Sequence, residues 1–285
     1  MEHYNITSNL SSLHYYLAYH PTILNFSWTP GQTLGASPLF VAVAVLSYLS
    51  LTLLLPRLAL PAISPQILRP VTFLHSVSLF LLSAAMAGGC FLNILTHTPR
   101  HHPHWIFCYP LKIHRSGPFF FWAYVFYLSK YLEFVDTLLI ILSRSIRRLT
   151  FLHVFHHCMV VVMCYLSLEM AQSMFLTVVI SNSAVHVVMY CYYALCAIGI
   201  RPKWKKVVTE CQILQFKLSF VATALVLYLH YVGVGCSGVR SWCFNVVLTA
   251  SLLALFINFH NKNYSKGSST NKGFGDNRVH HSKDV

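Results

Sequence analysis

The segment His-Val-Phe-His-His at residues 153–157 carries the side chains of this sequence that are best suited to chemistry. On a helix, His153, His156 and His157 are three and four positions apart, so their imidazoles share one face. The following residues, 158–168, are almost wholly apolar, which places the rings inside or at the edge of a membrane. Ionisable groups in that environment are costly and usually functional. An imidazole there can act as a nucleophile or as a general acid or base.

Three further polar clusters interrupt apolar stretches of the sequence. Within each cluster the polar side chains recur at helical spacing. The first cluster contains Lys130, Glu133, Asp136 and Thr137, the second contains Asn182, His186, Met189, Tyr190, Tyr192 and Tyr193, and the third contains Thr209, Gln212 and Gln215. Three charges on one membrane span are too costly to face lipid, so the first cluster is either part of a site or a set of ion pairs that lock the bundle. Hydrogen bonding between helices is the alternative role for the two glutamines.

The composition favours a polytopic membrane protein. Hydrophobic residues make up 56% of the 285 residues and charged residues only 9%, whereas roughly a quarter of the residues are charged in soluble domains. Segments long enough to cross about 30 Å of hydrocarbon are predicted at 36–55, 71–95, 117–143, 150–168, 172–198, 206–232 and 242–259. The prediction is an all-α fold with seven transmembrane helices in one membrane domain, residues 36–259.

The distribution of Lys and Arg predicts which side of the membrane each segment faces. With the N-terminus outside the cytosol, 14 of these residues fall on the cytosolic side and 4 on the opposite side, which is the bias expected of an inserted membrane protein. The net charge of +13 then reflects this bias and an anionic substrate, not a nucleic-acid partner. Residues 1–35 are predicted to be a lumenal segment, and residues 260–285 a mostly disordered cytosolic tail.

The polar clusters are expected to meet at one depth in the membrane. With a rise of 1.5 Å per residue, Asp136, His156 and Gln212 lie roughly 10 Å from the cytosolic ends of their helices. His186 lies somewhat deeper, at about 15–18 Å. The remaining spans and the lumenal halves are predicted to be aromatic and aliphatic. This arrangement suits an amphiphile whose anionic head comes from the cytosol and whose alkyl tail lies within the membrane.

In order and spacing, the four clusters resemble the signature boxes of the ELO family of very-long-chain fatty-acid elongases, KxxExxDT, HxxHH, NxxxHxxMYxYY and TxxQxxQ. All four boxes are complete, and the resemblance covers about residues 35–265. The HVFHH form of the second box is similar to that of plant elongase 3-like members. The fold that this resemblance implies is seven helices, six of them forming a barrel around an acyl tunnel, in the endoplasmic reticulum membrane.

The activity implied by the resemblance is that of a 3-ketoacyl-CoA synthase. Such an enzyme condenses a long-chain acyl-CoA with malonyl-CoA, releases CO₂ and CoA, and extends the chain by two carbons. No cofactor and no metal site is implied. The implied partners are acyl-CoA, malonyl-CoA and membrane lipid, together with the ketoacyl reductase, dehydratase and enoyl reductase of the elongation cycle. A homodimer is a further option.

The residues of the boxes can be assigned roles in this reaction. His156 is the expected nucleophile, which takes the acyl group as an acyl-imidazole, and His186 is expected to orient or protonate the malonyl group. His153 and His157 are candidates for binding the carbonyl or neighbouring carboxylates, and Asn182 and Gln212 for donating to an oxyanion. The expected substrate-binding residues are Lys130, Glu133, Asp136, Tyr190, Tyr193, Gln212, Gln215, Arg144, Arg148, Lys203 and Lys206.

Two other classes of protein share parts of this pattern. A membrane di-iron desaturase or hydroxylase also contains HxxHH, but it resembles this chain less because those enzymes carry about eight histidines in three clusters. A seven-helix receptor or transporter fits the topology, but does not explain why four spans bring polar groups to one depth. On the lumenal side, where oxidation is permitted, Cys108 is expected to pair with Cys236.

Overall fold

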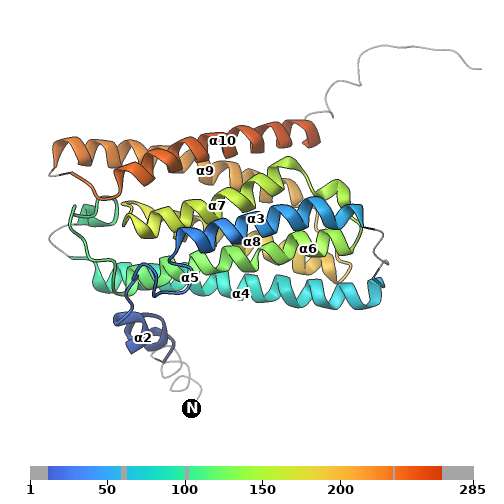
Figure 1. The fold of residues 1–285 in the computed structure, drawn as a ribbon, viewed down its shortest axis with the longest axis horizontal. Coiled ribbons are helices and arrows are strands. Elements are labelled where there is room, and N and C mark those ends of the chain that lie inside the picture. The colour runs from blue at the N-terminus through green and yellow to red at the C-terminus, as the bar shows by residue number, and fades with distance from the viewer. Residues whose placement is uncertain (1–11, 59–62, 100–102, 234, 265–285) are drawn as a thin grey trace, which may run out of the picture.

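The computed structural model describes residues 12–58, 63–99, 103–233 and 235–264, and this part of the chain is helical (Figure 1). The only extended pairing within these ranges is an isolated antiparallel bridge between Ser27 and Ser116. The longer helices are α3 (Pro38–Leu54), α4 (Pro65–His97), α5 (Pro118–Leu132), α6 (Phe134–Leu142), α7 (Phe151–Glu169), α8 (Phe175–Ala197), α9 (Lys205–Val232) and α10 (Val239–Tyr264). Short elements are η1 (Tyr15–Tyr19), α2 (Pro21–Leu24), η2 (Leu55–Arg57), η3 (Pro103–Ile106) and η4 (Ile146–Arg148).

Six helices of the described chain are long and apolar enough to cross a membrane, so the protein is a polytopic membrane protein, as predicted. They are Pro38–Arg57, Pro65–His97, Phe151–Glu169, Phe175–Ala197, Lys205–Val232 and Val239–Tyr264. Of the predicted boundaries, the start of α4 differs most, because this helix begins at Pro65 and not at residue 71. Helix α10 continues to Tyr264, and the rest of the predicted tail, like residues 1–11, lies outside the described residues.

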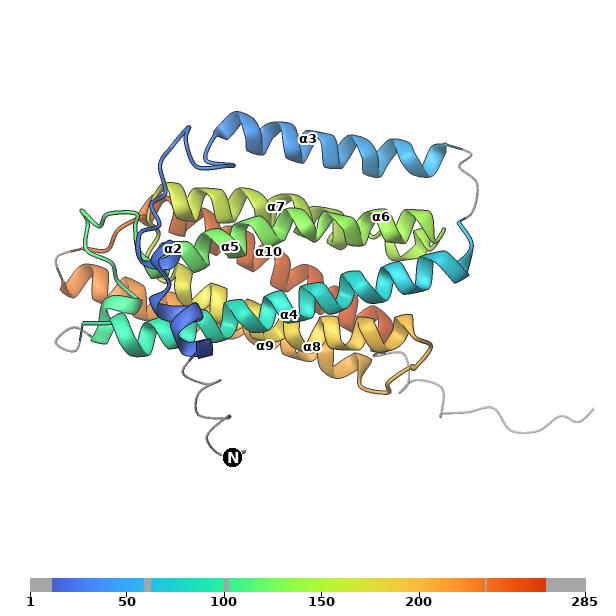
Figure 2. The same ribbon diagram turned by 90° about the horizontal axis from the view of Figure 1, so that it is seen from below.

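The predicted span 117–143 is helical over nearly its whole length, but a one-residue turn at Glu133 divides it into two helices. It consists of α5 and α6, which meet at Glu133 and follow one another along α7 (Figure 2). The break coincides with the carboxylate that Lys130 and His186 contact.

The long helices close into a ring, which confirms the expected barrel. Helix α4 contacts α5 and α8, α5 contacts α7, α7 contacts α10, and α9 lies between α10 and α8. With α5 and α6 counted as one stave, the barrel has six staves. Helix α3 packs outside it against α7 and α6, and Figure 2 shows it as a separate layer.

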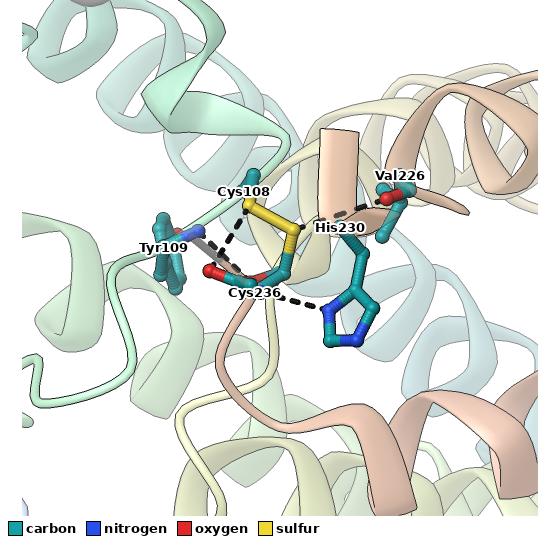
Figure 3. Close-up of a disulfide and its surroundings, with 7 residues drawn as sticks. Cys108, Tyr109, Val226, His230 and Cys236 are labelled. Carbon is teal, nitrogen blue, oxygen red and sulfur yellow. Dashed lines mark hydrogen bonds between the residues drawn. A yellow bond between two sulfur atoms is a disulfide. The ribbon is translucent and has the colours of Figure 1, made fainter. Parts of the chain in front are cut away.

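The two ends of the barrel differ in chemistry. At one end, which we call the disulfide end, Cys108 bonds to Cys236 and ties the segment before α5 to the α9–α10 connection (Figure 3). This confirms the predicted pair. Beside the disulfide, the backbone N–H of Cys236 donates to Nδ1 of His230 over 2.9 Å. The opposite end, the basic end, holds the connections α6–α7 and α8–α9 (Figure 2).

Candidate active site

A buried ion cluster forms where α5 breaks. Nζ of Lys130 lies 2.6 Å from Oε1 of Glu133, and both side chains are almost fully enclosed, at 2% and 3% exposure. Nδ1 of His186, on α8, lies 3.4 Å from the same carboxylate oxygen. Lys130 also donates to Oδ1 of Asn182 over 3.3 Å. The break in the helix therefore joins the first and second sequence clusters through one carboxylate.

The amide of Asn182 extends this network to a third helix. Its Nδ2 donates to Oε1 of Gln215, on α9, over 3.5 Å. Gln215 is buried at 8% exposure, and both amides border an internal cavity. The third sequence cluster thus joins the site through Gln215.

The histidine box lies at the start of α7. Thr150 caps this helix, because its Oγ1 accepts from the backbone N–H of His153 over 3.3 Å. The His153 ring is held by Thr137 of α6, with 2.8 Å between Nε2 and Oγ1. His157 packs against both other imidazoles, with ring centroids 4.4 Å from His153 and 5.3 Å from His156. Two of the three rings are therefore fixed by neighbouring side chains.

His156 differs from the other two histidines of the box in its surroundings. It is the member of the box that borders the cavity. Among the described residues, no hydrogen-bond partner occupies its ring nitrogens. The ring is accordingly available to a molecule in the cavity, beside the amides of Asn182 and Gln215.

The cavity runs inside the barrel and contains about 670 Å³ of empty space, including its open side. Its walls come from α5, α7, α8, α9 and α10 and from the connection between α7 and α8. Most of the lining side chains between its two ends are apolar, including Val160, Met163, Val178, Phe216 and Phe220. No charged side chain lines this cavity within the described ranges. Such a space suits an alkyl chain whose reactive end is at His156.

A second polar branch reaches two residues outside the sequence boxes. Oδ2 of Asp136 accepts from the hydroxyl of Tyr190 over 2.7 Å, and its Oδ1 lies 3.0 Å from Nε2 of His75 on α4. The Tyr48 hydroxyl, on α3, lies 2.9 Å from Oγ1 of Thr137. Sequence reasoning missed His75 and Tyr48, although a lone histidine in an otherwise apolar span is a signal that could have been followed.

Several predicted binding residues are not drawn into this network. Nε2 of Gln212 lies 3.6 Å from the sulfur of Met189, and it does not border the cavity, whereas Gln215 does. The Tyr193 ring packs against Tyr190 and Tyr192. The basic residues Arg144, Arg148, Lys203 and Lys206 are exposed at the basic end. Of these, Lys206 lies 3.3 Å from Glu210, one turn along the same helix.

The described residues contain no group of three or more His, Cys, Asp or Glu side chains arranged to hold a metal ion. This geometry gives no support to a di-iron centre, which needs several imidazoles and carboxylates around each iron. The arrangement instead offers an unpartnered imidazole, two amides and a neutralised ion cluster at one end of an apolar cavity. Those groups can perform acyl transfer, in which a nucleophile and oxyanion donors act together.

Comparison with known proteins places the chain among the elongases. The profile of the family described as ELO: GNS1/SUR4 matches residues 33–272. The chain is 30% identical over 278 residues to Fatty acid elongase 3-like of Arabidopsis thaliana, covering 91% of this chain and 94% of that protein. It is 33% identical over 261 residues to Fatty acid elongase A of Dictyostelium discoideum, covering 88% and 92%. Very long chain fatty acid elongase 5 of Xenopus laevis is 35% identical over 154 residues, covering 52% and 50%.

Proposed function

The chain is a fatty-acid elongase of the ELO (GNS1/SUR4) family, and from that premise we propose that it is the condensing enzyme of elongation, a very-long-chain 3-oxoacyl-CoA synthase. It joins a long-chain acyl-CoA to malonyl-CoA with loss of CO₂ and CoA. The observation that carries this proposal is the position of His156, an unpartnered imidazole at one end of an internal, mostly apolar cavity.

In the first step of the proposed mechanism, the acyl chain lies in the cavity with its thioester at His156. A ring nitrogen attacks the carbonyl carbon, the carbon–sulfur bond breaks, and CoA leaves with the proton of the imidazole. The negative charge on the carbonyl oxygen needs donors within hydrogen-bonding distance. The Nδ2 amide group of Asn182, which lines the same cavity as His156, is the donor we assign to this role.

In the second step, malonyl-CoA binds beside the acyl-imidazole. Loss of CO₂ leaves an enolate, whose carbon attacks the acyl carbonyl and displaces the His156 nitrogen, and the released imidazole takes up one proton from solvent. We assign the binding or protonation of the malonyl oxygen atoms to His186, whose Nδ1 lies 3.4 Å from Glu133; its side chain does not line the cavity, so the malonyl group must extend past the cavity wall to reach it. The product is a 3-ketoacyl-CoA two carbons longer. Holding both reactants in one cavity converts a bimolecular reaction into a step within one complex.

The exposed cations of the basic end provide a surface for the phosphates of CoA. The cationic side chains exposed there include Arg144, Arg148, Lys203 and Lys206. Guanidinium groups bind phosphate in a bidentate manner, and lysines bind it as point charges. On this proposal the CoA remains outside the barrel while its acyl chain enters. The product would then pass to the ketoacyl reductase, dehydratase and enoyl reductase, and a homodimer is compatible with this arrangement.

This proposal places the basic end in the cytosol and the protein in the endoplasmic reticulum membrane. The tail should then be digested by protease added to sealed microsomes, because positively charged segments stay on the cytosolic side. An epitope appended after Val285 is a suitable reporter. A tail that remains intact until detergent is added would contradict the orientation.

The cavity should also limit the length of the product. Replacing Val246 with phenylalanine fills part of the lining, so the longest product made by cells expressing this variant should lose at least one two-carbon unit. The matched control is the same substitution at Val247, which is 67% exposed on the outside of α10. Equal product lengths for both variants would argue against the chain lying in this cavity.

The reaction itself is tested by incubating the purified protein with a long-chain acyl-CoA and ¹⁴C-carboxyl malonyl-CoA. We expect release of labelled CO₂ in a one-to-one ratio with a 3-ketoacyl-CoA. If neither product forms with any chain length in an active membrane preparation, the condensing role is wrong.

A further inference from the structure

The cavity has a second polar end, far from His156. Helix α7, the following connection and α10 bring together Ser167, Gln172, Ser241 and Asn245, which are all buried. Oε1 of Gln172 accepts from Oγ of Ser167 over 2.9 Å, from Oγ of Ser241 over 2.7 Å and from Nδ2 of Asn245 over 2.5 Å. This finding corrects the expectation that the lumenal halves of the helices are only aromatic and aliphatic.

The network leaves three polar atoms open. Nε2 of Gln172, Oδ1 of Asn245 and Nε1 of Trp242 are buried and have no hydrogen-bond partner among the described residues. All three residues line the cavity, and the first two are only 1% and 7% exposed. Buried polar atoms are normally paired, because an unpaired one loses the hydrogen bonds it made with water.

The backbone holds these atoms in place. The N–H of Gln172 donates to the carbonyl of Ser167 over 2.8 Å, and the N–H of Ser173 donates to the carbonyl of Ser237 over 3.1 Å. Gly238, at φ +74°, lies so close that a Cβ atom there would be 2.4 Å from Cα of Gln172. The connection between α9 and α10 therefore packs directly on the residue that organises the cluster.

The open atoms define the chemistry of a ligand. They offer two donors and one acceptor, and no charged side chain of the described chain lines the cavity. A carboxylate ligand would therefore find no counter-ion here. The open atoms favour a neutral group that both accepts and donates a hydrogen bond, as a hydroxyl does. Eleven positions along α7 separate His156 from Ser167, about 16 Å at 1.5 Å per residue. That distance is about half of the ~30 Å hydrocarbon core of a bilayer. One long acyl chain of a lipid leaflet spans about the same half.

We propose that this end of the cavity recognises a hydroxyl group at the far end of the acyl chain, so that ω-hydroxyacyl-CoA is a substrate. The hydroxyl oxygen accepts from Gln172 or Trp242, and its proton is donated to Asn245. This inference rests on the proposed function, since it requires the acyl chain to lie in the cavity with its thioester at His156. A methyl-terminated chain would leave the three atoms unpaired.

The test compares kcat/KM of the full-length protein for ω-hydroxyacyl-CoA and for unsubstituted acyl-CoA over a series of chain lengths. At the length that reaches the cluster we expect a preference of at least about 5-fold for the hydroxyl, because hydrogen-bonding sites discriminate against analogues that lack the partner. A mid-chain hydroxyl of the same length should be disfavoured, since it meets the apolar walls.

Two variants locate the origin of the preference. Asn245→Leu removes the acceptor and Trp242→Phe removes one donor, so each should lower the ratio of the two kcat/KM values toward one. Asn258→Leu, an exposed position on the same helix, should keep the ratio of the wild-type protein. If the wild-type protein prefers the unsubstituted acyl-CoA at every chain length, the inference is overturned and the condensing function still stands. Absence of turnover with every acyl-CoA would instead overturn the function.

Discussion

His156→Ala is expected to lower the rate of condensation by at least about 10³-fold. The ring borders the cavity and has no hydrogen-bond partner in the described chain. In the proposed mechanism its removal takes away the nucleophile, and it breaks no hydrogen bond of the fold. Steady-state release of CO₂ from malonyl-CoA measures the effect. The variant should elute as a single species in detergent and should melt within a few degrees of the wild-type protein.

The matched control for this variant is His114→Ala. His114 is exposed on the connection at the disulfide end, and its replacement should leave the rate of condensation unchanged. A His156→Ala protein that retained one tenth or more of the wild-type rate would show that this ring is not the nucleophile.

Lys130→Met is expected to cause the largest loss of stability. The partner carboxylate, Glu133, is 2.6 Å away and both side chains are almost fully enclosed. Removing one partner of a buried pair leaves an uncompensated charge, which typically costs about 3–5 kcal/mol. We expect the variant to unfold at a markedly lower temperature in detergent, as followed by loss of helical circular dichroism.

Two further variants show whether the loss of stability comes from breaking the ion pair or from removing the lysine side chain itself. The double variant Lys130→Met, Glu133→Gln has no buried unpaired charge, so it should recover a substantial part of the loss. Lys206→Met removes an exposed partner one turn from Glu210 and should cost no more than about 0.5 kcal/mol. A double variant as unstable as the single one would show that the ion pair is not the source of the stability.

The sequence was sufficient to predict the elements that span the membrane and the side chains that meet inside them. Apolar length alone predicts helices such as α7 and α9 to within a few residues. The spacing of the histidine box puts its rings on one helical face, and the rings do contact one another in the fold. The pairing of Cys108 with Cys236 followed from the distribution of basic residues along the chain, which assigned both cysteines to the same side.

Other features depend on contacts between distant segments and leave little local trace. The break at Glu133 lies in a stretch without Gly or Pro, and the Glu133 carboxylate contacts both Lys130 and His186. Which of Gln212 and Gln215 borders the cavity depends on the rotation of α9 about its axis. The sequence does not determine this rotation, because the two residues are three positions apart and lie on the same helical face. The cluster around Gln172 forms because α10 brings Asn245 against the connection between α7 and α8. In the sequence, this connection has the pattern of an ordinary polar turn.

The central claim is that His156 carries the acyl group during the reaction. It is tested most directly by mixing the purified protein with a long-chain acyl-CoA alone. We predict release of about one equivalent of free CoA per active site and a peptide spanning residues 153–157 that is heavier by the mass of the acyl group, with His156→Ala showing neither. If CoA is released only when malonyl-CoA is present, and no acylated peptide is found, the reaction proceeds without the covalent intermediate and the account is contradicted.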